Sequence, residues 1–533
     1  MTSELLVTQP HLDTSGILRT RGPFTDFDDF LDAINDAQPG DEIILANGSY
    51  NVSRNKDTKF SGRRGTAANP IIVRAEIVGG ATLQGSAGYK FDNCKFFTWY
   101  GFNHAHEAIS KEDNIVFEEG NNNRFARCDI KLADKIEIDG EVKRADEIDG
   151  IDKEFLDDEN VRHWLKISNC KTMKVDHCHF HNKETKGNFC IVGFDQDNKN
   201  GEGPLFEYNH FQHQDLDQHV DAADIGDAGG EGVRMGHSDM DRTYFRAIFR
   251  YNYLDKCNGD GETVTNKSSG NIYYNNSWVD NNGSLVLRHG DSTAVLGNYF
   301  EKCGLRVGGA DNLIANNHFT RNSNDNGGRR PLVIMNGDMV RPSEPGGNME
   351  CVINNDIILN TFANGDGMTE QIVRWGWSRN SEKPTGNRFR GNIITAQHGK
   401  LLEFTNEATA SGNTITDNIG FVTGDADFGD LSTGMATRID PLLILEDGNS
   451  NDGIHRLRDG SRARNKFIGT PFSSLTTVDI FGMTRGENTD AGCCQFSTGS
   501  TTIPKKRITP ADVGAKATTD LGNSPPWNPN SED

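Results

Sequence analysis

The sequence predicts an all-β protein built as a single-stranded parallel β-helix, a solenoid, and three observations support this prediction. Hydrophobic residues are only 35% of the 533 residues, while 58 glycines and many asparagines indicate frequent turns. Short apolar runs separated by turns follow one another from about residue 70 onward and share a recurring motif. One amphipathic helix precedes these runs, where a solenoid needs a cover over its open end.

The recurring motif is Asn or Cys, then any residue, then an apolar residue. Between Asn252 and Asn317 it returns after 24, 22 and 19 residues, and elsewhere mostly after 31 to 43, as expected where a coil carries an inserted loop. A period near 20 with a fixed polar position is typical of a solenoid, and asparagines at one corner of successive coils can form a side-chain ladder. A β-propeller is the structural alternative, although its blades need about 40 residues and four strands each. The motif begins at Cys128, Cys178, Asn209, Asn252, Asn276, Asn298, Asn317, Asn355 and Asn392.

The predicted N-terminal capping helix covers residues 24–38. Four apolar residues fall at i, i+3, i+4 and i+7, which places them on one helical face. Thr25 is positioned to cap the first turn. The apolar stripe consists of Phe27, Phe30, Leu31 and Ile34.

The chain divides into three predicted parts. An N-terminal extension covers 1–23, the β-helix catalytic domain covers 24–500, and a C-terminal tail rich in Thr, Pro, Asn and Lys covers 501–533. The charged stretch 131–160 interrupts the repeat and is interpreted as a long excursion from one coil. A solvated flap without chemistry is the favoured interpretation of that excursion.

Charge and hydropathy limit the possible partners. The formal net charge is −22 and no basic tract offsets it, which argues against a nucleic-acid partner. Residues 231–310 differ, with nine Lys or Arg and nine Asp or Glu, so a groove for an acidic polysaccharide fits this neutral window best. An ordinary acidic surface is the alternative. No apolar run approaches the roughly 18 residues that a membrane span needs.

The cysteines and the first residues indicate the compartment. Ten cysteines without a CxxC pair argue against a zinc ribbon, and their wide spread argues against a small disulfide scaffold. We expect mostly buried thiols, with no role assigned to Cys493 and Cys494. The start, MTSELLVTQPHLD, lacks the basic and apolar regions of a signal peptide. A secreted or periplasmic protein whose signal has been removed is expected in preference to a cytoplasmic one.

The densest polar constellation covers residues 257–269 and is followed by 285–290. Within it, Asp260 and Glu262 alternate along a predicted strand and therefore share a face. Two carboxylates on one face repel unless a cation lies between them, and hard oxygen ligands of this kind suit Ca²⁺. Calcium is the expected cofactor, and two solvated turn acids are the alternative.

Three cations occupy comparable positions in successive coils. Lys267, Arg288 and Arg306 lie nine, ten and eleven residues before the motif asparagine of their coils. We therefore expect them to stack on neighbouring strands, about 4.8 Å apart per step. Stacked cations repel, so such a ladder indicates a bound anion. Three cations paired with local acids are the alternative.

These groups suit a β-elimination on a uronate. A cation on the uronate carboxylate stabilises the carbanion-like transition state, and a base must remove the C5 proton. Lys267, surrounded by Arg288 and a metal, would have a lowered pKa and serve as that base. Arg288 would assist the departing O4 oxygen by its charge or by a relayed proton, because arginine is a poor literal acid.

Two motifs form a specific pair: NKS at 266–268 and LRHG at 287–290, with 21 residues from the lysine to the arginine. Further segments extend the pattern over most of residues 39–320. On these segments the chain resembles polysaccharide lyase family 6, the family of alginate lyases and chondroitinase B. The segments are PGDEIILANGSY at 39–50, NPIIVRAEIVGGATLQG at 69–85, HCHFHNKETKG at 177–187, GGEGVRMGHS at 229–238, CNGDGETVTNKSSGN at 257–271, LVLRHG at 285–290 and LRVGGADNLIANNHF at 305–319.

The resemblance implies a right-handed parallel β-helix and a metal-assisted β-elimination. It implies Lys267 as the Brønsted base and Arg288 as the Brønsted acid. Four other residues match family positions and are predicted to bind substrate. These residues are His289, Arg306, Arg234 and Lys183. For Lys183 a structural role is the alternative, and for Arg234 pairing to a local acid.

The chain departs from the family pattern at the implied calcium site. The resemblance places calcium on the carboxylates of Asp260 and Glu262, where the family usually has Glu-x-Glu. Ala228 stands where the family has an asparagine ligand. Calcium would then be weakly held, or held differently through Asp227 or Glu231, or absent. Without calcium, neutralisation of the substrate carboxylate would fall to Arg and Lys residues.

The leading expectation is an alginate lyase that leaves 4,5-unsaturated uronate ends. A dermatan sulfate or chondroitin lyase is one alternative, and would need extra basic contacts for sulfate. A non-catalytic carbohydrate-binding β-helix is another, favoured by the missing asparagine ligand. A glycoside hydrolase on the same fold would need grouped aspartates and a Gly-His-Gly segment, and the sequence has no such segment.

Overall fold

Two units of the chain carry the fold, and each is described by itself. The first consists of residues 1–198, 202–230 and 510–520, and the second of 199–201, 231–509 and 521–533. None of the described helices is long and apolar enough to cross a membrane. The computed structural model describes residues 12–53, 55–107, 114–133, 135–138, 141–144, 163–184, 187–194, 202–215, 230–240, 243–321, 330–338, 352–363, 370–378, 380–445, 453–468, 474–496 and 507–518.

Helix α1 (Phe27–Asn35) confirms the predicted capping helix. Phe30, Leu31 and Ile34 of its apolar stripe are buried. The ring of Phe30 lies 6.5 Å from that of Trp99 and 6.3 Å from that of Phe102. The predicted cap at Thr25 is wrong by one residue. Asp26 caps the helix, because its carboxylate accepts hydrogen bonds from the backbone N–H groups of Asp28 and Asp29.

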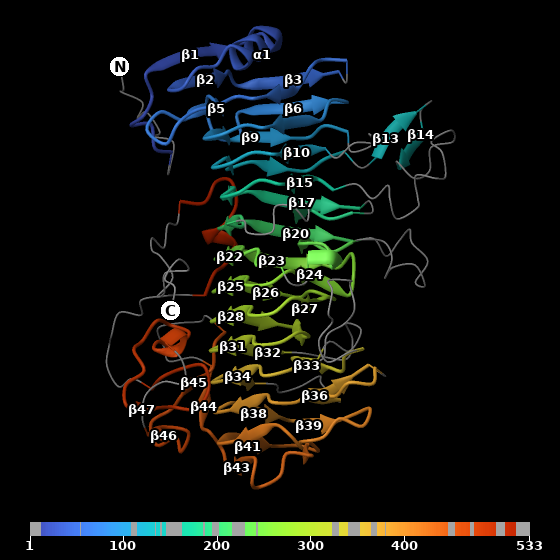
Figure 1. Ribbon diagram of the computed structural model, residues 1–533, viewed down its shortest axis with the longest axis vertical. Helices are drawn as coiled ribbons and strands as arrows, with labels where there is room; N and C mark the ends of the chain where they lie inside the picture. Colours follow the sequence, from blue (N-terminus) through green and yellow to red (C-terminus); the bar gives the residue numbers. More distant parts are fainter. Residues whose placement is uncertain are drawn as a thin grey trace. The chain divides into compact units, whose positions relative to one another are not determined.

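In the first unit each coil contributes one strand to each of three parallel sheets, so that strands three apart in the chain pair with one another (Figure 1). The stride lengthens once, where the antiparallel hairpin of β13 (Lys135–Ile138) and β14 (Glu141–Arg144) leaves the coil. This hairpin is the described part of the predicted excursion. Sheet A1 contains β1 (Arg19–Phe24), β2 (Asp41–Leu45), β5 (Ile71–Ala75), β8 (Phe97–Tyr100), β11 (Arg124–Ala126), β16 (Lys174–Asp176) and β19 (Leu205–Glu207). Sheet B1 contains β3 (Gly48–Val52), β6 (Ala81–Gly85), β9 (Phe102–His104), β12 (Asp129–Ile130), β17 (His179–Lys183) and β20 (His210–Gln214). Sheet C1 contains β4 (Lys59–Ser61), β7 (Tyr89–Asp92), β10 (Ile115–Glu118), β15 (Leu165–Ser168) and β18 (Cys190–Gly193).

The second unit repeats this architecture with the same stride of three (Figure 1). Sheet A2 contains β22 (Ile248–Arg250), β25 (Ile272–Tyr274), β28 (Ala294–Leu296), β31 (Leu313–Ala315), β34 (Asp356–Ile358), β37 (Arg388–Arg390) and β40 (Thr414–Thr416). Sheet B2 contains β23 (Tyr253–Cys257), β26 (Ser277–Val279), β29 (Tyr299–Glu301), β32 (His318–Thr320), β35 (Thr361–Ala363), β38 (Ile393–Ala396), β41 (Asn418–Val422) and β43 (Ala436–Arg438). Sheet C2 contains β21 (Val233–Met235), β24 (Glu262–Lys267), β27 (Ser284–His289), β30 (Gly304–Val307), β33 (Leu332–Met335), β36 (Gln371–Trp377), β39 (Lys400–Phe404) and β42 (Asp427–Gly429). Single-turn 3₁₀ helices lie at Ser238–Met240 and Ser474–Thr476 in this unit, and at Pro510–Asp512 in the first.

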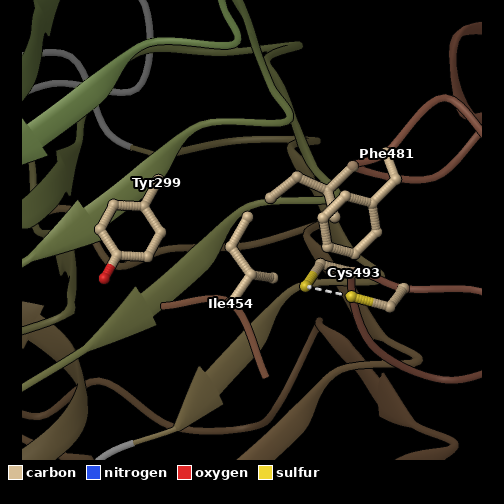
Figure 2. Close-up of a cluster of buried hydrophobic side chains, with 6 residues drawn as sticks. Tyr299, Ile454, Phe481 and Cys493 are labelled. Carbon is tan, nitrogen blue, oxygen red and sulfur yellow. Dashed lines mark hydrogen bonds between the residues drawn. The ribbon is translucent and has the colours of Figure 1, made fainter. Parts of the chain in front are cut away.

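The later residues of the second unit add two short antiparallel pairs and a small apolar cluster. The pairs are β44 (Leu443–Ile444) with β45 (Arg456–Leu457), and β46 (Phe467–Ile468) with β47 (Asn488–Thr489). Figure 2 shows Cys493 in this cluster, with its sulfur 3.5 Å from that of Cys494. The expectation of buried thiols is confirmed for the described cysteines, because all nine are free and buried. The adjacent pair therefore packs in this apolar cluster, together with Tyr299, Ile454 and Phe481.

A ladder of buried asparagines joins successive coils of the second unit. Each side-chain oxygen accepts a hydrogen bond from the backbone N–H of the preceding asparagine, as Asn298 does from Asn276 at 3.0 Å. Each side-chain NH₂ donates to a backbone carbonyl inside the coil, as Asn298 does to Tyr273 at 2.9 Å. The ladder confirms the predicted role of the motif. It runs through Asn252, Asn276, Asn298, Asn317, Asn360, Asn392 and Asn418.

One motif position falls on a different corner from the one predicted. Asn355 belongs to a second ladder, which runs from Asn312 through Asn387 to Asn413, and Asn360 takes its place in the first. The coil here carries asparagines at both corners, five residues apart, so the sequence pattern fits either register. Only the strand pairing shows which of the two asparagines belongs to which ladder.

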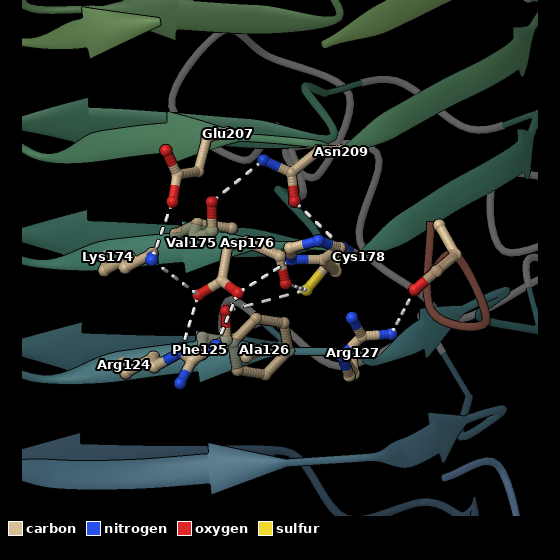
Figure 3. Close-up of polar contacts among 12 residues, drawn as sticks. Arg124, Phe125, Ala126, Arg127, Lys174, Val175, Asp176, Cys178, Glu207 and Asn209 are labelled. Carbon is tan, nitrogen blue, oxygen red and sulfur yellow. Dashed lines mark hydrogen bonds and ion pairs between the residues drawn. The ribbon is translucent and has the colours of Figure 1, made fainter. Parts of the chain in front are cut away.

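Cysteine replaces asparagine in the first unit, as predicted. The backbone N–H of Cys178 donates to the side-chain oxygen of Asn209 at 2.9 Å, and the Cys178 thiol points at the carbonyl of Phe125 at 3.6 Å (Figure 3). Beside it, the fully buried Asp176 accepts two hydrogen bonds of 2.7 Å from Arg124. Burial raises the pKa of Asp176, but the charge and hydrogen bonds of Arg124 outweigh burial, so this pKa lies well below its usual range.

We predict that Asn298→Ala destabilises the protein by about 2–4 kcal/mol, because it leaves the buried N–H of Asn276 without an acceptor and removes three donated bonds. Denaturant unfolding followed by circular dichroism measures the loss. The control Asn51→Ala, at an exposed position of β3, should change stability by less than about 0.5 kcal/mol. Equal free energies of unfolding for the two variants would contradict a stabilising role of the asparagine ladder.

Candidate active site

The three predicted cations lie on neighbouring strands of sheet C2, but not in one column. Lys267 ends β24, Arg288 lies in β27 and Arg306 lies in β30. In the observed register Lys267 pairs with His289, and Arg306 pairs with Val286. The predicted single ladder is therefore wrong in its register, although the residues are on successive coils as expected.

Bulges in the pairing of β24 with β27 explain the difference. The register shifts between Asn266 and Lys267, so Arg288 has no paired residue on β24. A bulge bends the strand and re-aims its side chain, a device that recurs beside active sites. Gly290 then turns the chain at φ +95°, and a Cβ there would lie 2.3 Å from the carbonyl oxygen of Ser268. The glycine of the RHG motif is thus required by backbone conformation and by space.

Lys267 has the properties of a base that works near neutral pH. Its side chain is buried, with 6% of the residue exposed. Burial lowers its pKa, the nearby charges of Arg234 and Arg288 lower it further, and Glu231 and Glu262 oppose them, with a net fall from 10.5 to about 8. A lysine with such a pKa is substantially neutral at slightly alkaline pH and can accept a proton.

Glu262 holds the cations of the neighbouring coils. Its Oε1 lies 3.4 Å from an Nη1 of Arg288 and 3.4 Å from an Nη1 of Arg306. Its Oε2 accepts a hydrogen bond of 2.6 Å from the Thr265 hydroxyl, which also lies 3.5 Å from Oε1 of Glu231. One buried carboxylate therefore orients two guanidinium groups, and Thr265 fixes the carboxylate in turn.

The two arginines differ in exposure and surroundings. The side chain of Arg306 is 16% exposed and its guanidinium carbon lies 4.7 Å from the centre of the Trp377 ring. Burial lowers the pKa of Arg306, with Glu262 acting against it. Arg288 is 41% exposed, so its guanidinium is open to a ligand from solvent. Sequence reasoning missed Trp377, which carries no motif and contacts Arg306 only in the folded chain. It assigned no role to Thr265, although this residue lies in the polar constellation 257–269.

The other predicted substrate-binding residues are distributed unevenly. Arg234 on β21 pairs in register with Thr265 and lies 3.5 Å from His237 Nδ1, close enough to Lys267 to affect its pKa. His289 is buried, with 1% exposed. Lys183 belongs to the first unit, where it is buried and lies 5.1 Å from the centre of the Trp164 ring. Substrate binding by these residues stays a prediction.

Three carboxylates make up the acidic half of the site. Burial and the charges of Glu231 and Glu262 raise the pKa of Asp260 to about 7, so three carboxylates lie near one another. Both oxygens of Glu262 already contact Arg288, Arg306 or Thr265. Among the described residues at this site, no three His, Cys, Asp or Glu side chains bring their ligand atoms within 4.8 Å of one another. Asp227 and Ala228 lie outside the described residues.

Comparison with known proteins agrees with this geometry. The family model of chondroitinase B matches residues 25–424, which is more than half of the chain. No curated protein matches.

Three solved structures share the fold. The PL6 family alginate lyase AlyGC aligns with a TM-score of 0.67 at 19% identity, over 93% of this chain and 58% of its own. This chain thus spans 58% of the length of AlyGC. A mannuronic acid specific family 6 lyase from human gut microbiota aligns at 0.59 and 21% identity, over 76% and 86% of the two chains. The alginate lyase AlyF-OU02 aligns at 0.61 and 16% identity, over 84% and 93%.

These likenesses confirm the predicted right-handed parallel β-helix. The match of the family model goes further than the fold, because it covers the NKS and LRHG motifs and the strands that carry them. Lyases of this family often use calcium. The chain belongs to the chondroitinase B family, polysaccharide lyase family 6.

Proposed function

We propose that this protein is a polysaccharide lyase that cleaves a uronate-containing polymer, with alginate as the preferred substrate, by β-elimination. The observation that carries the proposal is the buried Lys267 at the end of β24, whose pKa falls to about 8 beside cations on adjacent strands. A structural lysine needs no such environment, whereas a general base does. The family to which the chain belongs supports the same reaction class.

In the proposed step Lys267 Nζ takes the proton from C5 of the uronate. The electrons of the broken C5–H bond form the C4=C5 double bond, the C4–O4 bond breaks, and O4 leaves with its electron pair and acquires a proton. Arg288 stabilises the charge on O4, directly or by relaying a proton from water. Its side chain is 41% exposed, against 16% for that of Arg306, so it is the more open of the two to a ligand from solvent.

Neutralisation of the substrate carboxylate is assigned to the arginine pair. Arg306 is fixed by Glu262 and Trp377 before substrate arrives, so little reorganisation is needed when the negative charge develops.

Alginate is proposed as the substrate because the structural neighbours named above are alginate lyases. It is a carboxylate polymer without sulfate, and the site offers cations arranged around one carboxylate, Glu262. Dermatan sulfate and chondroitin sulfate are the alternatives to be compared in the same assay. A polymer substrate of this kind also fits the proposed secreted or periplasmic location.

Lys267→Ala should abolish product formation from alginate, because the C5 proton then has no acceptor. The measurement is the ultraviolet absorbance of the unsaturated uronate, followed with alginate, polymannuronate, polyguluronate and dermatan sulfate. The control Lys302→Ala removes a lysine on the same unit that pairs with Asp280 at 3.4 Å, and should keep full activity. Reducing ends without absorbance would indicate a hydrolase, and binding without either signal would indicate a non-catalytic protein.

The pH dependence of kcat/KM should follow the pKa of Lys267. Activity is expected to rise with pH up to about 8 and then level off, because only the neutral amine accepts a proton. Arg234→Gln removes a charge that lowers this pKa, so the acidic limb should move to higher pH by about 0.5–1 unit.

Arg234→Lys keeps the charge and serves as the matched variant, so its limb should stay in place. An acidic limb at the same pH in wild type, Arg234→Gln and Arg234→Lys would contradict the assignment of Lys267 as the base.

Chelation separates the two ways of neutralising the substrate. Protein treated with EDTA and then freed of it should keep most of its rate, because Arg288 and Arg306 remain in place. The measurement is the initial rate with and without added CaCl₂. A rate that is lost on chelation and restored by Ca²⁺ but not by Mg²⁺ would contradict neutralisation by arginine alone.

A further inference from the structure

A compact group of two histidines and one aspartate lies in the first unit. Asp129 is on β12, and His179 and His181 are on β17, the paired strand of the next coil. His179 Nδ1 lies 3.2 Å from Oδ2 of Asp129, and His181 Nε2 lies 2.9 Å from Oδ1. Each carboxylate oxygen therefore faces one imidazole nitrogen, and all three ligand atoms lie within 4.8 Å of one another.

The spacing matches that of ligands on a small divalent cation. Ligand atoms bound to Zn²⁺ at about 2.0–2.1 Å are about 3 Å apart, as these nitrogen and oxygen atoms are. Among the described residues no other group of three His, Cys, Asp or Glu residues meets the same criterion. The residues are half-buried, with side-chain exposures of 38% for Asp129, 23% for His179 and 17% for His181, so a metal could enter from solvent and keep water ligands.

The hydrogen-bond partners of the two His179 ring nitrogens favour a cation beside Nδ1. Its Nε2 lies 3.2 Å from the side-chain oxygen of Gln212, an acceptor that places the single proton of a neutral ring on Nε2. Nδ1 then presents a lone pair to the Asp129 carboxylate, which is also an acceptor. A cation between the two atoms, either a metal or a second proton on His179, removes this conflict, and the Gln212 contact is the kind of partner that orients a metal-bound imidazole.

The alternative of two charged imidazoles is unfavourable here. The rings of His179 and His181 stack with centres 4.1 Å apart, and the ring of His210 stacks on His179 at 4.7 Å. Two imidazolium charges at this separation would face a single carboxylate charge. Neutral rings sharing one divalent ion with Asp129 avoid that repulsion.

We propose that Asp129, His179 and His181 bind a divalent transition metal, with Zn²⁺ as the preferred ion and water in the open position. Two imidazoles and one carboxylate suit Zn²⁺, Co²⁺, Ni²⁺ or Cu²⁺, whereas Ca²⁺ and Mg²⁺ prefer oxygen ligands. The three proposed ligands lie in the first unit, and both histidines share strand β17 with Lys183.

The position of the ligands indicates a structural role. Asp129 and His179 are 50 residues apart, and the chain between them includes the β13–β14 hairpin, where the stride of three is broken. A metal bound here would cross-link the two coils that flank this long insertion. A cross-link that closes a long loop gives a larger entropic stabilisation than one across a short turn.

The test is isothermal titration of chelator-treated full-length protein with ZnCl₂ at pH 7.5, together with thermal unfolding in the presence of excess Zn²⁺. We expect one equivalent of tightly bound Zn²⁺ and a raised Tm, because the metal binds the folded state. His181→Gln and Asp129→Asn should each weaken binding by more than the 10–100-fold that a lost second-shell partner costs. His398→Gln is the matched control, since His398 pairs with Asp425 alone and offers no third ligand.

Two further readouts make the outcome independent of folding and of activity. Co²⁺ bound in the site should give a visible absorption band that His181→Gln abolishes, with unchanged circular dichroism. Zn²⁺ affinity should fall in acid, because protons compete with the metal for the imidazoles. No Zn²⁺ uptake by the wild type, or uptake that is equal in His181→Gln and His398→Gln, would overturn the proposal and leave a cluster held by hydrogen bonds alone.

Discussion

The strand-to-strand register of the coils is the constraint on which the rest of this structure depends. Each coil of the second unit is fixed to the next by backbone pairing in three sheets and by a buried asparagine whose oxygen takes the N–H of its neighbour. Aromatic rings stack in the same register inside the unit, as Phe300 does on Phe319 at 4.6 Å. A side chain is therefore located by its strand and its place in the register.

Against that regular background the candidate active site lies where the register is broken. The bulges in the pairing of β24 with β27 leave Arg288 without an opposite residue, and Gly290 then makes a turn that no other residue fits. Glu262 links the neighbouring coils, because one of its oxygens contacts both Arg288 and Arg306, which lie on two other coils. The low pKa of Lys267 follows from burial next to cations that the fold itself has placed there.

Much of the fold was predictable from sequence because a solenoid repeats its signals. The period of the asparagine motif and the apolar stripe of helix α1 gave the class, the strand run and the capping helix. The register of single coils was not predictable where signals duplicate, as at Asn355 and Asn360, which sit five residues apart at two corners. For the same reason the bulge at Arg288 and the contact of Trp377 with Arg306 carry no sequence signal, since they arise from pairing between coils.

The central claim is that folding makes Lys267 neutral near pH 8. The most direct measurement is a ¹⁵N NMR titration of lysine-labelled protein, with the Lys267 resonance assigned by its absence in Lys267→Arg. The account predicts a side-chain nitrogen that titrates with a pKa of about 8, well below the 10.5 of an ordinary lysine. A Lys267 resonance that titrates near 10.5 would contradict the assignment of this residue as the base.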